Sequence, residues 1–100
     1  MKLINKNIEQ IRKICELNSV KHLFAFGSIT NDEFNERSDI DLVVEIQDTD
    51  PLNYTDKYFN LKFALEKLLG RTIDLLESKA IRNKLLKKEI DKTKLLVYGG

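Results

Sequence analysis

The segment from Asp39 to Ile46 alternates between apolar and other side chains, and this pattern limits the possible folds most strongly. Period-two alternation is typical of a strand with one covered face and one open face. The apolar positions 40, 42, 44 and 46 share one face, while Asp39 and Asp41 lie on the other. On a strand the Cα atoms of these two aspartates are roughly 6.5–7 Å apart. The segment therefore predicts a sheet with a carboxylate pair at the start of one strand.

Such a pair is costly, because two like charges about 5 Å apart repel by roughly 3 kcal/mol at an effective dielectric of about 20. The repulsion is tolerable where the pair is solvated, shares a proton or binds a cation. Mg²⁺ prefers carboxylate oxygens together with phosphate oxygens. An Asp-x-Asp pair thus suits a metal-bound nucleotide, and a solvated strand end is the alternative interpretation.

A second feature precedes the pair. The run Val20–Phe26 is apolar and rich in strand-forming residues, and it stops at Gly27-Ser28. A glycine directly after a strand permits a tight turn and a close approach of backbone N–H groups to an anion. The hydroxyl of Ser28 can donate to a phosphate oxygen. A plain turn is again the alternative, but the two features together, each at a strand boundary, indicate a phosphate and metal site.

Gly-Ser followed after ten residues by Asp-x-Asp resembles the signature of the DNA-polymerase-β-like nucleotidyltransferase superfamily. The surrounding Phe26-Gly27-Ser28 and Arg37-Ser38-Asp39-Ile40-Asp41, in so short a chain, resemble the minimal nucleotidyltransferases, the MNT class of antitoxin-like proteins. The resemblance covers essentially the whole chain. It implies a small mixed β-sheet flanked by helices, whereas periodicity alone indicates only an α/β or α+β fold.

The composition is that of one globular domain, residues 1–100. The chain is 42% hydrophobic and 33% charged, which is typical of a soluble protein. No apolar run approaches the length of a membrane span, and the N-terminus does not resemble a signal peptide. The single cysteine, Cys15, excludes an intramolecular disulfide and fits a packed core thiol. We therefore expect a cytoplasmic protein with no membrane partner.

The coarse pattern predicts alternating helices and strands. Helices are expected over about residues 5–17, 56–69 and 80–91, and strands over 20–26, 39–47, 71–77 and 94–98. A short helix or loop is expected between the first two strands. Gly70 is expected to end the second helix, and Pro51 can begin the segment after the second strand. The last helix is expected to turn four side chains inward, namely Ile81, Leu85, Leu86 and Ile90.

Two polar residues on the predicted strands need separate treatment. His22, the only histidine, lies early on the first strand and away from Ser28, so we expect no catalytic role. Asp74 interrupts the apolar run 72–76, where an unpaired buried carboxylate would be costly. From the residues alone Asp74 could cap a neighbour or pair with a cation. The resemblance implies instead that it is the third carboxylate of a metal site.

The resemblance implies nucleotidyl transfer from a nucleoside triphosphate, with ATP as the expected donor. It implies catalytic and metal-binding roles for Asp39, Asp41 and Asp74, which would hold two Mg²⁺ ions. Nucleotide-binding roles are implied for four residues near the signature: Gly27, Ser28, Arg37 and Ser38. Arg37 and Arg71 are candidate phosphate clamps. The chain departs from the family at Asn31-Asp32-Glu33, where many members carry an Arg-Gly pair that helps to hold the triphosphate.

The acceptor is not specified by the residues. The resemblance implies a HEPN-domain toxin as partner, with AMP added to one of its tyrosines, so that the chain acts as an antitoxin. A binding antitoxin with weak or no catalysis is one alternative, and a subunit of an aminoglycoside-type nucleotidyltransferase is another. Pairing with a second copy of the chain is open. The basic stretch 79–94 is expected to be a solvated or partner-facing surface rather than a nucleic-acid site.

Overall fold

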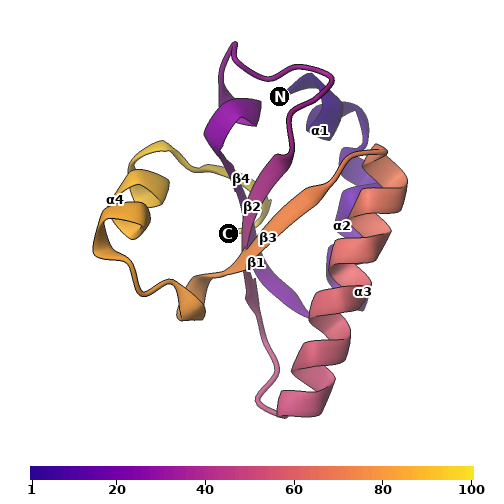
Figure 1. Ribbon diagram of the computed structural model, residues 1–100. Coiled ribbons are helices and arrows are strands. Elements are labelled where there is room, and N and C mark those ends of the chain that lie inside the picture. The colour runs from indigo at the N-terminus through magenta and orange to yellow at the C-terminus, as the bar shows by residue number, and fades with distance from the viewer.

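The chain folds around a four-stranded mixed sheet with helices on both faces (Figure 1). The computed structural model describes residues 1–100. The elements in chain order are α1 (Lys2–Lys6), α2 (Ile8–Leu17), β1 (Val20–Phe26), the 3-10 helix η1 (Gly27–Thr30), β2 (Ile40–Ile46), α3 (Pro51–Leu69), β3 (Ile73–Glu77), the 3-10 helix η2 (Ser78–Ala80), α4 (Lys84–Thr93) and β4 (Leu95–Gly99). No helix has both the length and the apolar character needed to cross a membrane.

The strands lie in the order β3-β2-β1-β4. β1 is antiparallel to both β2 and β4, whereas β3 is parallel to β2. A parallel pair needs a crossover connection, and α3 supplies it here. The small mixed sheet implied by the family resemblance is therefore confirmed.

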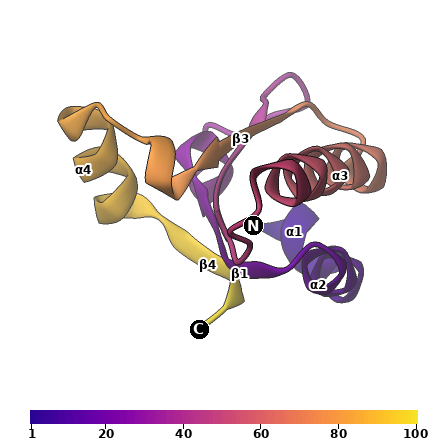
Figure 2. The ribbon, with the colours of Figure 1, turned by 90° about the horizontal axis from the view of Figure 1, so that it is seen from below.

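One face of the sheet is covered by α1, α2 and α3, and α4 lies on the opposite side (Figure 2). The even-numbered side chains of β2 point into the covered face and are almost fully buried, as the alternation predicts. Cys15 of α2 is fully buried in the same core. Burial raises the pKa of the Cys15 thiol to about 12, which keeps it protonated. The opposite face of β2 carries Asp41 and Glu45, with the buried Val43 between them.

α3 is longer than the sequence pattern predicts, because it begins at Pro51 rather than near residue 56. Asp50 caps the helix: its Oδ1 accepts hydrogen bonds from the amides of Leu52 at 2.9 Å and Asn53 at 3.4 Å. Proline is favoured at the first helical position, where its missing N–H is not needed. The predicted end is confirmed, since Gly70 adopts a left-handed conformation with φ 65°.

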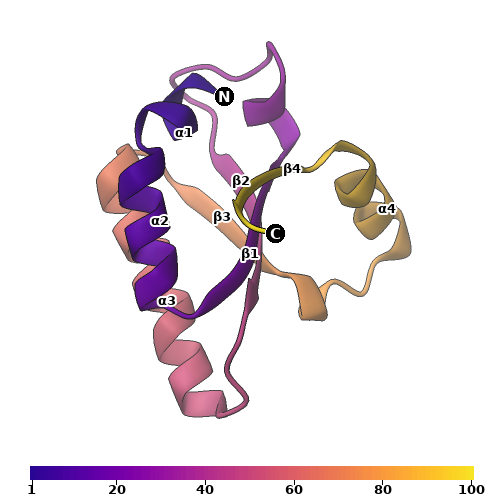
Figure 3. The same cartoon turned by 180° about the vertical axis from the view of Figure 1, so that it is seen from behind.

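The prediction for the last helix is only partly right. α4 starts at Lys84, where Asn83 caps it, and η2 occupies part of the expected range. Ile90 is buried as predicted, but Leu85 is 76% exposed and Leu86 is 41% exposed. The inward orientation predicted for Leu85 is wrong, and Leu86 is only partly covered, because α4 packs mainly against η1 at one side and not into the main core. Figure 3 shows this separation of α4 from α2 and α3.

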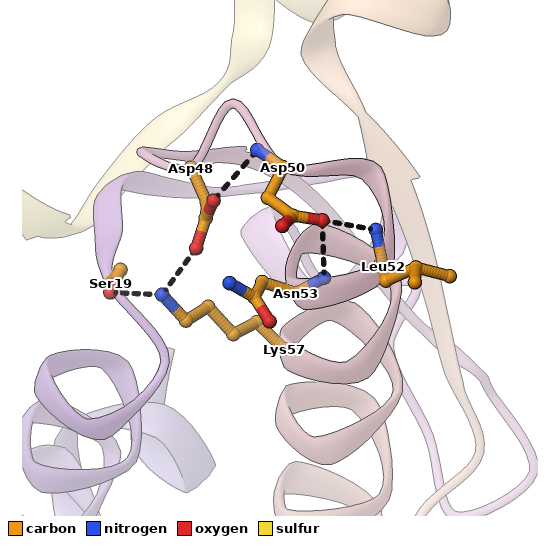
Figure 4. A network of polar contacts seen from close by, with 6 residues as sticks. All are labelled: Ser19, Asp48, Asp50, Leu52, Asn53 and Lys57. Carbon is orange, nitrogen blue, oxygen red and sulfur yellow. Dashed lines mark hydrogen bonds and ion pairs between the residues drawn. The ribbon is translucent and has the colours of Figure 1, made fainter.

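A polar network joins α3 to the turn between α2 and β1, at the end of the sheet where β2 finishes (Figure 4). Lys57 Nζ lies 2.7 Å from Asp48 Oδ2 and donates to Ser19 Oγ at 2.9 Å. Ser19 has φ 55°, a left-handed conformation that is unfavourable for a residue with a Cβ. The hydrogen bond from Lys57 is the main cause that lowers the pKa of the Asp48 carboxyl, and the Asp50 amide adds to it.

We expect Lys57→Met to lower the thermal midpoint at pH 7 by a few degrees, because it removes the partner of Asp48 and the donor to Ser19. A carboxyl whose pKa is lowered on folding stabilises the fold above its unfolded pKa of about 3.9, and this contribution is lost as the pH falls through the lower folded value. The difference between wild type and variant should therefore shrink below about pH 4. Circular dichroism melts measure it, and Lys13→Met on the exposed face of α2 is the control. A constant difference down to pH 2 would contradict the assignment.

Candidate active site

The centre of the site is a pair of carboxylates on neighbouring strands. Asp41 of β2 and Asp74 of β3 are register partners in the parallel pair. Neighbouring strands lie about 4.8 Å apart, and register partners share a face. Ile73 and Leu75, on either side of Asp74, are buried on the covered face. The strand alternation therefore directs both carboxylates to the face that α1, α2 and α3 do not cover.

Asp39 joins this pair from the loop that precedes β2. It is exposed, and the residue after it is fixed by a hydrogen bond from the Ile40 amide to the Thr72 carbonyl, at 3.0 Å. Thr72 lies two residues before Asp74. The structure thus brings the three predicted carboxylates to one end of the sheet.

Gly27, which directly follows β1, lies next to the Asp41 carboxylate. Phe26, the last residue of β1, is the register partner of Asp41, so the chain turns at Gly27 directly beside the Asp41 side chain. Gly27 has φ 73°, and a Cβ built there would lie 2.5 Å from Asp41 Oδ2. Glycine is needed at this position for two reasons: the left-handed backbone and the close approach of the carboxylate. The sequence indicated the first reason only.

The environment of Asp41 opposes its ionisation. Partial burial raises the pKa of the Asp41 carboxyl, and the nearby charges of Asp74 and then Asp39 raise it further. A cation bound among the three groups would relieve the repulsion and favour the charged form. Shifts of this origin are typical of functional sites, although ion-pair networks also produce them.

The residues present fit a magnesium site that substrate completes. No group of three or more His, Cys, Asp or Glu side chains is gathered closely enough to hold a metal ion by itself. Mg²⁺ is usually held by one or two carboxylates together with substrate phosphates, rather than by a cage made only of protein ligands. The half-buried Asp41, pressed against Gly27 and flanked by the exposed Asp39 and Asp74, offers this kind of open donor set.

The remaining predicted nucleotide-binding residues are chain neighbours of Gly27 or of Asp39. Ser28 is half-buried in η1, directly after Gly27. Ser38 is half-buried beside Asp39, and its Oγ accepts from the Asn35 amide at 3.1 Å. Arg37 is exposed, and its side chain makes neither an ion pair nor a hydrogen bond within the protein. Arg71, by contrast, is engaged with the loop before Asp39: its Nη2 donates to the Ser38 carbonyl at 2.5 Å.

His22 lies away from these residues, as expected. It is at the start of β1 and is paired in register with Glu45, at the opposite end of β2 from Asp41. Its Nδ1 is buried and lies 3.6 Å from Glu45 Oε1, too far for a hydrogen bond. The structure therefore keeps the only histidine apart from the carboxylates.

Of two hollows in the protein surface, one lies away from the carboxylates and the other lies beside Gly27. The largest, of about 610 Å³, is at the far end of the sheet and is lined by Lys21, Asp48 and Lys79 among others, so it does not include the carboxylates. A smaller one of about 240 Å³ lies between Gly27 and α4, with Phe26, Leu86 and Ile90 as its apolar lining. Sequence reasoning missed this second hollow, because only the fold brings α4 next to Gly27.

Comparison with known proteins agrees with this geometry. The family model for polymerase beta nucleotidyltransferases matches residues 9–99. A Methanocaldococcus jannaschii protein named as a candidate protein adenylyltransferase is 37% identical over 102 residues, covering 98% of this chain and 99% of its own length.

Solved structures share the fold. A toxin–antitoxin complex with AMP-PNP has a TM-score of 0.73 at 23% identity, covering 94% of this chain and 74% of that chain. A tri-AMPylated Shewanella oneidensis HEPN toxin in complex with an MNT antitoxin gives 0.67 at 21% identity, covering 97% and 73%. At these identities the likeness shows that the fold is the same.

The contact between Gly27 and Asp41 can be tested with two glycines that share a backbone conformation. Gly27→Ala and Gly70→Ala both place a Cβ at positive φ, which costs about 1–2 kcal/mol. Only Gly27→Ala also displaces a carboxylate, since nothing lies within 4 Å of a Cβ at Gly70. We expect Gly27→Ala to be the less stable variant in urea unfolding. Equal losses of stability would contradict the close contact.

The crowding of Asp41 also predicts a stability effect. A carboxyl whose pKa is raised on folding favours the fold below its unfolded pKa of about 3.9, and this contribution is lost as the pH rises through the folded value. At pH 7 the ionised Asp41 therefore destabilises the protein, and Asp41→Asn should raise the thermal midpoint. The gain should disappear towards pH 4. Asp56→Asn, on the exposed side of α3, is the control, and a lower midpoint for Asp41→Asn at pH 7 would refute this account.

Proposed function

The chain belongs to the polymerase beta nucleotidyltransferase family, and we propose that it transfers AMP from ATP to a tyrosine of a HEPN-domain toxin and so acts as the antitoxin. The observation that carries the proposal is the position of Asp41, which lies against Gly27 and in register with Asp74, with Asp39 nearby. These four residues are the phosphate-binding and metal-binding parts that nucleotidyl transfer requires.

The donor and the acceptor are proposed from similar proteins. The M. jannaschii relative is named as an adenylyltransferase that acts on protein, and it matches the chain over nearly its whole length. One solved neighbour holds AMP-PNP, an ATP analogue, and another is a complex of an MNT antitoxin with an AMPylated HEPN toxin. Together they support ATP as the donor and a protein hydroxyl as the acceptor.

In this proposal Asp39, Asp41 and Asp74 hold two Mg²⁺ ions with the phosphates of the donor. Mg²⁺ bound there would neutralise phosphate charge and lower the pKa of the acceptor hydroxyl. Asp41 would contribute to holding both ions, because its carboxylate is the register partner of Asp74 and lies near the charges of Asp74 and Asp39. Its contact with Gly27 restricts its side chain before any ligand arrives.

The phosphates of the donor are bound by the residues around Gly27. Its backbone N–H and the Ser28 hydroxyl donate to the β- or γ-phosphate oxygens. Ser38 and the unengaged guanidinium of Arg37 directly precede Asp39 in the chain and contribute hydrogen bonds and positive charge. Arg37 partly replaces the cation of the Arg-Gly pair that this chain lacks at 31–33. The apolar hollow beside Gly27 offers room for the nucleoside.

The transfer itself is an in-line displacement. The tyrosine oxygen forms a bond to the α-phosphorus, the bond from that phosphorus to the bridging oxygen breaks, and pyrophosphate leaves. Asp74 accepts the phenolic proton. It is suited to this role because it is exposed on β3, an edge strand of the sheet, where a protein acceptor can approach.

One alternative has a structural observation in its favour. The three carboxylates are not gathered around one point, and the chain has acidic and amide side chains at 31–33, where the family resemblance implies an Arg-Gly pair. Both features fit a binding antitoxin that blocks its toxin without modifying it. The alternative and the proposal differ in whether AMP is transferred.

The decisive experiment incubates the protein with Mg²⁺ and ATP labelled at the α-phosphate, with and without the protein encoded by the neighbouring gene. We expect label on a tyrosine of that protein, and a loss of at least about 100-fold in rate for Asp39→Asn and Asp74→Asn, because each removes a group that acts at the reacting phosphate. Mass spectrometry locates the AMP.

Asp56→Asn on α3 is the matched control, because it removes one exposed carboxylate without touching the site. If the two proteins form a complex and the toxin is silenced with no transfer of label, the binding alternative holds. Transfer at the same rate by wild type and by Asp39→Asn would show that these carboxylates do not form the site.

A further inference from the structure

The loop of residues 31–39 carries Asp39, and Phe34 is its one apolar side chain that packs against the hydrophobic core. Most of the loop is exposed. Its internal side-chain hydrogen bonds join residues that are close in the sequence. The side chain of Asn31 accepts from the Glu33 amide, and that of Asn35 accepts from the Arg37 amide, both at 2.8 Å. Such bonds shape local turns. They do not determine where Asp39 lies relative to Asp41 and Asp74.

Besides the hydrogen bond from the Ile40 amide to the Thr72 carbonyl, one side chain from outside the loop contacts it. The guanidinium of Arg71 lies over the Phe34 ring, with Cζ 4.5 Å from the ring centroid. Its Nη2 donates to the Ser38 carbonyl at 2.5 Å and also to the Asn35 carbonyl. A single planar group thus contacts the loop at three points. One of these points, the Ser38 carbonyl, belongs to the peptide group directly before Asp39.

Arg71 is itself held in place by its neighbours. Gly70, which ends α3 in a left-handed conformation, donates its amide to the Glu66 carbonyl at 2.9 Å. The carboxylate of Glu66 accepts from the Ile73 amide at 3.0 Å. The backbone on both sides of Arg71 is therefore fixed by Glu66, so the guanidinium extends from a rigid turn.

We propose that Arg71 is a positioning residue that holds Asp39 beside Asp41 and Asp74. The two peptide groups that flank Asp39 are tied to consecutive residues of one turn: Arg71 binds the Ser38 carbonyl, and the Thr72 carbonyl accepts from the Ile40 amide. The same turn leads directly into Asp74. Arg71 therefore aligns the loop carboxylate with a strand carboxylate, rather than clamping phosphate as the sequence suggested. The metal-binding consequence rests on the proposed function.

The shape of the side chain is part of this role. A guanidinium presents fixed N–H donors and stacks on aromatic rings, whereas the lysine ammonium is a compact, strongly hydrated charge. Arg71→Lys keeps the charge but loses the planar group that stacks on the Phe34 ring while it donates to the two carbonyls. We expect it to lie between wild type and Arg71→Ala in every measurement that reports the position of Asp39.

The test measures the weak Mn²⁺ affinity that the open carboxylate set has without nucleotide, where no phosphate can contact Arg71, from the electron paramagnetic resonance signal of the free ion. We expect Arg71→Ala to weaken Mn²⁺ binding by about tenfold or more, as the loss of outer-shell partners does at metal sites. Arg71→Lys should recover part of the loss. Arg12→Ala is the control: Arg12 is exposed on α2, 3.1 Å from Glu9, and a surface ion pair of this kind contributes little.

A second readout does not depend on metal or activity. Amide hydrogen exchange at Ser38 and Ile40 should become faster in Arg71→Ala, because both amides belong to the segment that Arg71 holds, while the amides of β1 stay protected. Unchanged exchange and unchanged Mn²⁺ affinity in Arg71→Ala would overturn the inference. Should Arg71→Ala fail to fold, Arg71→Lys takes its place in both measurements.

The two proposals can fail separately. If wild type transfers no AMP, the proposed function fails, and if wild type binds no Mn²⁺ without nucleotide, hydrogen exchange alone decides the role of Arg71. Faster exchange confined to the loop then supports the positioning role, and exchange equal to wild type refutes it. If wild type binds Mn²⁺ and Arg71→Ala binds it equally well, the positioning role fails and the proposed function stands.

Discussion

The contact between Asp41 and Gly27 is the constraint on which the candidate site depends. It packs a carboxylate against a backbone where no Cβ would fit, and strand register places a second carboxylate on the next strand. Burial and repulsion both act against this arrangement. The covered face offsets the unfavourable terms with a continuous apolar core, to which each strand contributes. The apolar core on the covered face thus stabilises the fold, while the crowded carboxylates on the other face destabilise it. Such a loss of stability is common at functional sites.

Much of this arrangement follows from period-two patterning. The alternation around Asp41 specifies which side chains share a face, and an aspartate between Ile73 and Leu75 specifies the same for β3. The family resemblance adds that the sheet is mixed, which alternation cannot provide, and the order of the strands comes from the structure alone. What no local pattern contains is the contact of Gly27 with the Asp41 carboxylate, because it joins two strands through a register that only the folded sheet defines.

Some errors in the sequence-based prediction concern features that a local sequence signal specifies, and others concern features that only the tertiary structure determines. The start of α3 could have been found, since Asp50-Pro51 is a capping residue followed by a favoured first helical residue. The exposure of Leu85 could not, because an amphipathic helix does not reveal how much of its apolar side a small sheet can cover. The contacts of Arg71 with Ser38 and Asn35 span more than 30 residues of sequence and carry no periodic signal.

The parallel pairing of β2 and β3 makes the two ends of α3 unequal in their tolerance of length changes during evolution. The connection from Gln47 to Asp50 lies at the end of the sheet away from the carboxylates, so an insertion there leaves the register of Asp74 intact. At the other end, one residue added between Gly70 and Asp74 would shift β3 by one position and turn Asp74 to the covered face. Descendants of this chain can therefore acquire new surface loops before α3, while the turn after it must keep its length.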